Sequence, residues 1–208
     1  MNTTDLFIKA YTSIFFVMGP FSIIPFFVSL TEKSDKREKD QVINKATVTS
    51  FFICLFFALT GNFVFRLFGI TIDSFRVAGG LLLLLMAISM LQAHQSKIRV
   101  NEEEQLDSME KEDISVFPLS IPLIAGPGTI TTVVLFTGEA VIPIHYAILL
   151  LALLLSSLSM FIILKFSHKV YEVIGKSGIN ILTRLIGLIL ATMGVEFILK
   201  GVQSYLKL

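Results

Sequence analysis

The chain has little charge, a single cysteine and no tryptophan, and these shortages narrow what it can be. Only 16% of its 208 residues are charged, whereas soluble domains average about 25%. The formal net charge is +1, so no global basicity points to nucleic acid. The lone Cys54 excludes an intramolecular disulfide and a thiolate metal cluster. What remains is strongly apolar, because 54% of the residues are hydrophobic and the mean hydropathy is +0.79.

Six apolar runs are long enough to cross a membrane, since about 20 helical residues span about 30 Å of hydrocarbon. They are Leu6–Leu30, Ile43–Phe68, Phe75–Gln92, Val116–Thr137, Ile142–Phe166 and Ile181–Val202. The polar segment 93–115 between the third and fourth runs is acidic and is expected to be a solvated cytoplasmic loop. The first run shows no cleavage site, so we interpret it as a retained span. The sequence predicts an all-α integral membrane protein.

Lysine and arginine are unevenly distributed among the links, and such residues favour the cytoplasmic side. The links after the first, third and fifth runs contain Lys33, Lys36, Arg37, Lys39, Lys97, Arg99, Lys111, Lys165, Lys169 and Lys176. The opposite side contains Lys9, Arg66, Arg76, Lys200 and Lys207. We therefore expect both termini on the outer side of the membrane.

Helix-breaking residues interrupt two of the runs, and hydroxyl side chains follow each break. The residues concerned are Gly19, Pro20 and Ser22 in the first run, and Gly126, Pro127, Gly128, Thr129, Thr131 and Thr132 in the fourth. Proline removes a donor and clashes with the preceding turn, so a helix must stop and restart there. The restarting helix points free N–H groups and a partial positive charge at the gap, which suits a carboxylate. We predict that these residues bind a small zwitterion or anion.

The two breaks lie 107 residues apart, and other matches occur at nearly the same offset. These pairs are Ser22 with Thr129, Arg76 with Arg184, Gly79 with Gly187, and Gly69 with Gly175. The offset predicts two repeats of three spans, residues 1–92 and 116–208, joined by the loop 93–115. Three is an odd number, so the second repeat would enter the membrane from the other side. Inverted repeats with paired broken helices are typical of secondary transporters.

Several blocks of the sequence resemble the MarC family of bacterial and archaeal inner-membrane proteins. They are Gly19-Pro20 with the nearby Pro25, Leu67–Gly80, Pro118–Ile130 and Thr183–Val195. The resemblance implies a six-span protein of the inner (plasma) membrane, related to the LysE-type exporters, that transports small neutral amino acids such as glycine and alanine. The family name implies antibiotic resistance, a link generally regarded as unsupported. Relatives commonly carry asparagine where this chain has Gly19, and often an uncharged amide at Glu196.

Each candidate residue has a structural interpretation beside the functional one. The breaks could be kinks that allow close helix packing. Arg76 and Arg184, each at the start of a span, either snorkel to the interface or gate the site. Glu196 lies inside the last span and either carries a coupling proton or pairs with Lys200 one turn on.

The sequence favours a secondary transporter of small neutral amino acids that works by alternating access. A coupling proton or sodium ion and a homo-oligomer are compatible with it. The alternatives are a non-transporting membrane scaffold or accessory protein, or an exporter of other small metabolites or drugs. The spans contain no recognisable catalytic set, so we expect no enzyme activity, no cofactor, no metal and no nucleic-acid partner.

Overall fold

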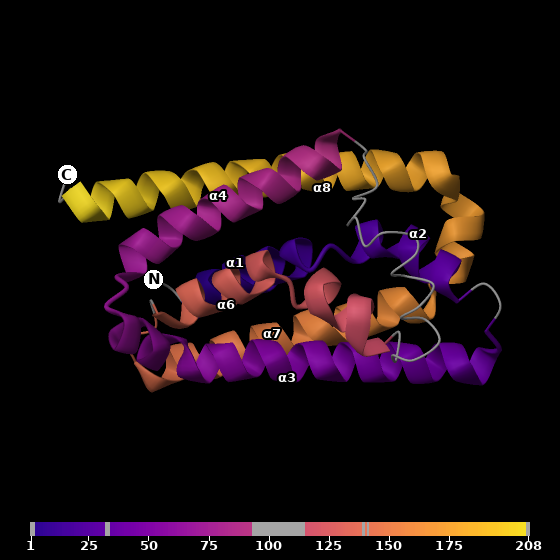
Figure 1. The fold of residues 1–208 in the computed structure, drawn as a ribbon, viewed down its shortest axis with the longest axis horizontal. Coiled ribbons are helices and arrows are strands. Elements are labelled where there is room, and N and C mark those ends of the chain that lie inside the picture. Colours follow the sequence, from indigo (N-terminus) through magenta and orange to yellow (C-terminus); the bar gives the residue numbers. More distant parts are fainter. Residues whose placement is uncertain (1–2, 32–33, 93–114, 139, 141, 207–208) are drawn as a thin grey trace.

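The computed structural model describes residues 3–31, 34–92, 115–138, 140 and 142–206, and every regular element among them is a helix (Figure 1). The elements are α1 Thr3–Val17, α2 Pro20–Leu30, α3 Lys36–Phe68, α4 Ile72–Leu91, η1 Ser115–Ile124, α6 Pro127–Gly138, α7 Pro143–Lys165 and α8 Ser167–Leu206. η1 is a π-helix, and α8 is kinked at Gly175, where φ is 69°. The predicted loop 93–115 lies outside the described residues except for Ser115, the first residue of η1.

Five helical segments are long and apolar enough to cross a membrane: Thr3–Leu30, Lys36–Gly61, Ile72–Leu91, Pro143–Lys165 and Ser167–Leu206. The first of these segments, Thr3–Leu30, comprises α1 and α2 together. The remaining predicted span, the fourth (Val116–Thr137), is covered by η1 of 10 residues and α6 of 12 residues, and neither reaches spanning length alone. The reason is the Gly126-Pro127 pair, since proline ends one helix and begins the next. The predicted all-helical membrane class is confirmed.

Local signals determine where several helices begin. Before α3, the Asp35 N–H donates to Glu38 Oε2 at 3.0 Å, and the Glu38 N–H donates to Asp35 Oδ1 at 2.8 Å. This reciprocal capping box satisfies two N–H groups that have no partner within the helix. Pro20 and Pro143 stand at the start of α2 and α7, where a helix makes no use of an N–H group. Each of these starts follows from residues adjacent in the sequence.

The helices α4 and α8 form an antiparallel pair along one side of the molecule (Figure 1). A Cβ at Gly80 would lie 2.5 Å from the Gly194 carbonyl oxygen, and a Cβ at Gly194 would lie 2.7 Å from the Gly80 carbonyl oxygen. Near one end of the pair, a Cβ at Gly201 would lie 2.8 Å from the Asp73 carbonyl oxygen. Close backbone approach at small residues is a main source of helix association in lipid. The glycines therefore hold this pair together.

The other helices surround an apolar core. In Figure 1, α3 and α7 lie on the side opposite the α4–α8 pair, with α1 and α6 between. α1 contacts α7, η1 contacts α3, α6 contacts both α3 and α4, and α2 contacts α8. The largest cluster of buried apolar residues draws on α1, α2, α3, η1, α6 and α7. Both predicted breaks are at the centre of this arrangement because Met18 and Ala125 belong to that cluster.

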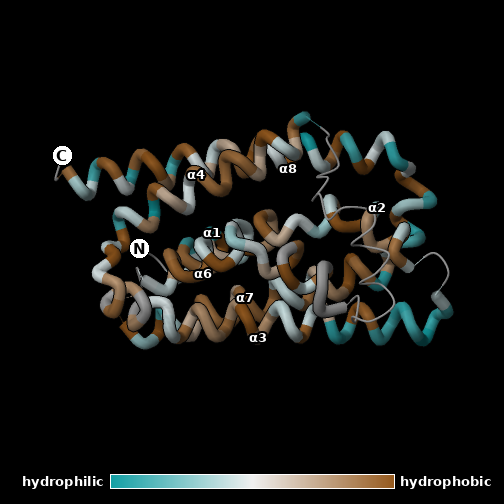
Figure 2. The backbone as a smooth tube through the Cα atoms, in the orientation of Figure 1, coloured by the Kyte–Doolittle hydropathy of each residue, from teal (hydrophilic) through white to brown (hydrophobic). Residues whose placement is uncertain are grey.

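Large apolar side chains remain exposed along the outer faces of the long helices. Examples are Phe52 and Phe56 on α3, Leu85 on α4, and Leu185 and Leu199 on α8. A soluble monomer seldom exposes so extensive an apolar surface, whereas a membrane protein presents it to lipid. Figure 2 shows hydrophilic residues gathered at the start of α3 and the start of α8, with hydrophobic residues along the spans. The fold is that of a multi-pass membrane protein.

Candidate functional site

The first break is a turn of the backbone at Gly19. α1 ends at Val17, and α2 begins at Pro20. Between them Gly19 has φ of 63° and ψ of 45°, the left-handed region that glycine enters without a steric penalty. Its carbonyl oxygen accepts the N–H groups of Ser22 at 3.0 Å and Ile23 at 3.2 Å. The backbone itself thus forms this break, and no side chain caps the start of α2.

The second break is closed by a side chain. η1 ends with the Ala125 N–H donating to the Ser120 carbonyl oxygen at 2.9 Å, five residues back. Across the gap, the Thr129 hydroxyl donates to the Ile124 carbonyl oxygen at 2.8 Å. Because η1 ends at Ile124, this carbonyl group lies at a helix end and has no partner within its own helix, so the hydroxyl satisfies a polar group that lipid could not. Thr129 therefore has a structural role here.

The two breaks meet in space. A Cβ at Gly128, in the first turn of α6, would lie 3.3 Å from Val17 Cγ1, at the end of α1. The same Cβ would lie 3.2 Å from Leu83 Cδ2 and 2.7 Å from Met86 Sδ, both on α4. Gly128 is thus a position where the absence of a side chain lets α1, α4 and α6 converge. The structure brings together the ends of helices that are more than 100 residues apart in sequence.

Two hydroxyls near the breaks are buried without a hydrogen-bond partner among the described residues: Ser22 Oγ and Thr132 Oγ1. Leaving a buried polar group unpaired costs about 1 to 3 kcal/mol. Three further hydroxyls share this condition, on Thr47, Ser157 and Ser167. Ser22 and Thr132 stand apart from those three because each follows a break in its own helix. Unpaired buried hydroxyls at this point are able to bond a polar ligand.

The remaining residues predicted for the breaks differ in their surroundings. Gly126 and Pro20 are buried, whereas Pro127 is exposed. Thr131 lies in the contact between α6 and α4, because a Cβ at Gly79 would overlap its methyl carbon Cγ2. From the sequence, the same ligand-binding role was predicted for Thr129, Thr131 and Thr132. In the structure one closes the break, one packs on α4, and one is unpaired.

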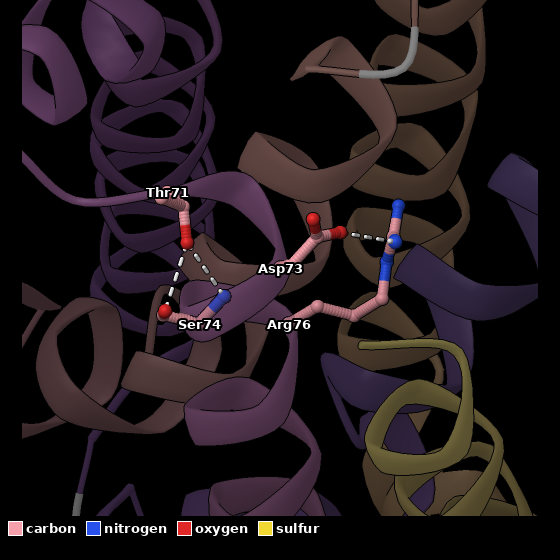
Figure 3. Close-up of polar contacts among 4 residues, drawn as sticks. All are labelled: Thr71, Asp73, Ser74 and Arg76. Carbon is pink, nitrogen blue, oxygen red and sulfur yellow. Dashed lines mark hydrogen bonds and ion pairs between the residues drawn. The ribbon is translucent and has the colours of Figure 1, made fainter. Parts of the chain in front are cut away.

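Arg76 lies in a polar cluster at the start of α4 (Figure 3). Its Nη1 is 3.2 Å from Asp73 Oδ1, and the two side chains are only 12% and 28% exposed. Beside this ion pair the Thr71 hydroxyl accepts the Ser74 N–H at 3.1 Å and caps the helix. Asp73 is not among the residues predicted from the sequence, although the spacing of three residues on a helix signals such a pair. Arg76 therefore has a carboxylate partner within its own helix.

Arg184 and Glu196 both lie on the exposed side of α8. Glu196 Oε1 is 3.0 Å from Lys200 Nζ, and both side chains are more than half exposed. This contact favours the interfacial pair among the two interpretations of Glu196. Within the part of the chain that the structure describes, no group of three or more His, Cys, Asp or Glu could hold a metal ion.

The fold and the paired breaks define a multi-pass helical membrane protein with two interrupted spans. Residues 4–206 match the sequence profile of the family described as MarC family integral membrane protein, so the chain belongs to the MarC family. The relatives confirm this membership over nearly the whole chain, and the resemblance of the sequence blocks is confirmed with it.

Three relatives illustrate the match. A UPF0056 membrane protein of Aquifex aeolicus is 37% identical over 202 residues, which are 97% of this chain and 94% of that protein. One of Methanocaldococcus jannaschii is 38% identical over 200 residues, which are 96% and 97%. YvbG of Bacillus subtilis is 38% identical over 199 residues, which are 95% and 94%. Their names describe them only as membrane proteins. No solved structure matches the chain.

Proposed function

We propose that this protein is a secondary transporter of small neutral amino acids, of the size of glycine and alanine, that works by alternating access. The observation that carries the proposal is the meeting of two broken helices at Gly128 and Val17, with unpaired hydroxyls on Ser22 and Thr132. Transporters of this kind bind substrate at the interrupted helices near the middle of the membrane. The family resemblance favours the same class of substrate.

The chemistry of the buried side chains supports a substrate without net charge. The buried polar side chains among the described residues are serines and threonines, with no carboxylate, ammonium or guanidinium group among them. A net charge would remain uncompensated among them, and burying such a charge is costly. A zwitterion brings both signs, and its carboxylate suits the positive end of a restarting helix. Val17, Leu83 and Met86 crowd the first turn of α6, which favours a small side chain.

The pairing of the elements supports an organisation as two inverted repeats. Exchanging α1 with η1, α2 with α6, α3 with α7 and α4 with α8 turns the more extensive of the observed contacts into one another. The α1–α7 contact becomes the η1–α3 contact, and the α2–α8 contact becomes the α4–α6 contact. In both the α1–α7 contact and the η1–α3 contact, a serine hydroxyl donates to a backbone carbonyl oxygen of the other helix. Ser156 donates to the Tyr11 carbonyl oxygen at 3.2 Å, and Ser120 donates to the Ala46 carbonyl oxygen at 3.1 Å.

The orientation in the inner membrane is part of the proposal, with both termini outside. Figure 1 shows both termini at one end, and the ends of α2 and α7 at the other. The start of α3 and the junction of α7 with α8 lie at that second end and contain Lys36, Arg37, Lys39, Lys165 and Lys169, which favours the cytoplasm there. A coupling proton or sodium ion and a homo-oligomer belong to the proposal as well. Arg76 is retained as a gating candidate, because it is an ionised side chain held largely buried at a helix start.

One observation favours a different class, a membrane scaffold or accessory protein that does not transport. The residues at the breaks are nearly all buried, and Thr131 packs tightly on Gly79. Helix breaks that serve only helix–helix packing would be packed in this way. In the transporter, the same packing is one closed state of the cycle. An exporter of other small metabolites or drugs would share the cycle and differ in substrate.

Reconstitution into liposomes tests the proposal. Vesicles loaded with unlabelled glycine or alanine are expected to take up the labelled amino acid by exchange. The Thr132→Val variant is expected to lose this exchange, whereas the control Thr137→Val is expected to keep it. Thr137 is also a buried threonine of α6, but its hydroxyl bonds the Val133 carbonyl oxygen at 3.1 Å within the helix. If no exchange occurs under proton or sodium gradients of either direction, the non-transporting scaffold becomes the better-supported function.

A further inference from the structure

The first turn of α6 is enclosed by three side chains that differ in exposure. A Cβ at Gly128 would lie within 3.3 Å of Val17, Leu83 and Met86. Val17 is 1% exposed and Leu83 is fully buried, whereas Met86 is only partly buried. Met86 is therefore the outermost of the three. It is the partly exposed side chain next to the buried Gly128.

Gly128, which lies next to Met86, has an exposed residue before it and a buried unpaired hydroxyl one turn after it. Pro127, which precedes Gly128, is exposed, so the outside reaches the start of α6 at this point. Thr132 follows Gly128 by four residues and so lies on the same face of the helix, one turn deeper. Its side chain is 0% exposed, and its hydroxyl has no partner among the described residues. Met86 thus contacts α6 one turn before an unsatisfied polar group.

A second methionine lies near the corresponding place on α8. Met193 follows Met86 by 107 residues, one fewer than the 108 that separate Arg76 from Arg184 in the same two helices. Met193 of α8 packs on a buried cluster that includes Val17, and Phe21 of α2 packs on that cluster too. Val17 and Phe21 flank the first break. Met86 of α4 therefore lies beside the break in the second repeat, and Met193 of α8 packs on the cluster that includes Val17, at the end of α1.

We propose that Met86 and Met193 are the gates of the two breaks and set the largest side chain that the substrate can carry. The proposal rests on the proposed function and adds specificity-determining residues to it. Methionine is unbranched and has three rotatable bonds, so its thioether adapts to irregular gaps. A change of rotamer moves the sulfur away from Gly128 without any movement of the backbone. One methionine opening at a time would give access to the breaks from alternate sides.

Cysteine accessibility tests the gates without any substrate. Cys54 is the only cysteine and is fully buried, so Cys54→Ser gives a background without reactive thiols. Thr132→Cys then places a thiol at the unpaired hydroxyl. A charged, membrane-impermeant methanethiosulfonate is added to vesicles of known orientation. With Met86→Ala the labelling rate from one side is expected to rise at least about tenfold, since the closed population is lost.

Three further variants make the test selective. Leu85→Ala removes a side chain of similar size from the exposed face of α4, where Leu85 is 63% exposed, and is expected to leave labelling unchanged. Met86→Leu keeps the volume but is stiffer, and is expected to slow labelling in a protein that folds normally. Met193→Ala is expected to raise labelling from the opposite side. Equal labelling in wild-type, Met86→Ala and Met86→Leu backgrounds, or an equal increase with Leu85→Ala, would contradict the proposed gates.

Exchange assays separate this inference from the function on which it rests. With Thr132 intact, Met86→Ala is expected to raise the uptake of a larger neutral amino acid, such as leucine, relative to glycine. If Met86→Ala alters labelling but no variant exchanges any amino acid, the gates stand and the proposed transport fails. If glycine is exchanged but the ratio of leucine to glycine uptake and the labelling rate both stay unchanged, transport stands and the gates fail.

Discussion

The two breaks share a Gly-Pro sequence but differ in how the chain crosses the gap. At the first, Gly19 turns the backbone in the left-handed region, and its carbonyl oxygen accepts the N–H groups of the first turn of α2. At the second, a π-helix ends at Ile124, and the Thr129 hydroxyl bonds the carbonyl oxygen left there. Ser22, at the position that matches Thr129, has no hydrogen-bond partner among the described residues. The first break depends on the backbone and the second on a side chain.

This difference shows that a repeated motif does not imply a repeated set of interactions. Once Thr129 is engaged with Ile124, the unpaired hydroxyl of the second break is that of Thr132, one turn further on. In the first break the unpaired hydroxyl is at Ser22 itself. The two hydroxyls offered to a ligand therefore come from non-equivalent positions. A ligand with two different ends, such as a zwitterion, matches an asymmetric pair better than a symmetric one.

The largest expected effect is on exchange, from removing an unpaired hydroxyl. A hydrogen bond to a charged group contributes about 1.5 to 3 kcal/mol, so Thr132→Val should lower glycine exchange about tenfold to a hundredfold. The melting temperature should stay equal or rise, because the buried hydroxyl is unpaired without ligand. Ser22→Ala tests the first break in the same way. Labelled exchange and thermal unfolding of the same preparations provide both measurements, and a stability loss with normal exchange would contradict the assignment.

Removing the engaged hydroxyl should act in the opposite way on stability. Thr129→Val leaves the Ile124 carbonyl oxygen unpaired in a buried position, which should lower the free energy of unfolding by about 2 kcal/mol. Thr137→Val is the matched control, since its hydroxyl bonds carbonyl groups within the regular α6 helix. Chemical unfolding in detergent measures both. If Thr129→Val is no less stable than Thr137→Val, the hydroxyl does not close the second break.

The first break should be sensitive to its backbone instead. Gly19→Ala forces a Cβ into the left-handed region and should cost about 1 to 2 kcal/mol. Gly69 has nearly the same φ, 64°, with no neighbouring atom within 4 Å, so Gly69→Ala measures the strain alone. Both variants should lose similar stability, but only Gly19→Ala should impair exchange. Normal exchange by Gly19→Ala would separate the first break from the site.

The smallest effect is expected where a flexible side chain can move aside. Gly128→Ala places a Cβ 2.7 Å from Met86 Sδ, and overpacking against so adaptable a neighbour should cost about 1 kcal/mol. Because this cost arises from packing, the double variant Gly128→Ala with Met86→Ala should recover most of it. Double-mutant unfolding experiments measure the coupling. Additive losses would show that Gly128 is required for a reason other than contact with Met86.

Much of the fold could be predicted from local features of the sequence. Apolar length identifies the spans, and Gly-Pro pairs identify where two of them are interrupted. The exception in length, Val116–Thr137, follows from the same Gly126-Pro127 pair, because its two pieces are each too short to span. The π-helical form of η1 could not be predicted, since η1 packs against α3, an element distant in the sequence.

The site was harder to predict because the role of each residue depends on the direction in which its side chain points. Thr129, Thr131 and Thr132 are nearly adjacent, but successive residues of a helix point about 100° apart. One therefore faces the gap, one faces Gly79 of α4, and one is buried without a partner. Composition signalled hydroxyls at the break without separating these roles. Met86 gave no signal of its own, because only packing brings it to Gly128.

The sequence by itself determined that this is a helical membrane protein with two interrupted spans, because hydrophobic length and proline act locally. Only the tertiary structure decided which residues at equivalent positions of the two repeats have the same burial and the same polar partners. Arg76 pairs with Asp73 and is largely buried, whereas Arg184 is exposed, and position 181, the counterpart of Asp73, is isoleucine. The two breaks differ for the same reason. Burial and hydrogen bonding depend on neighbours that the fold supplies, and the two halves have different neighbours.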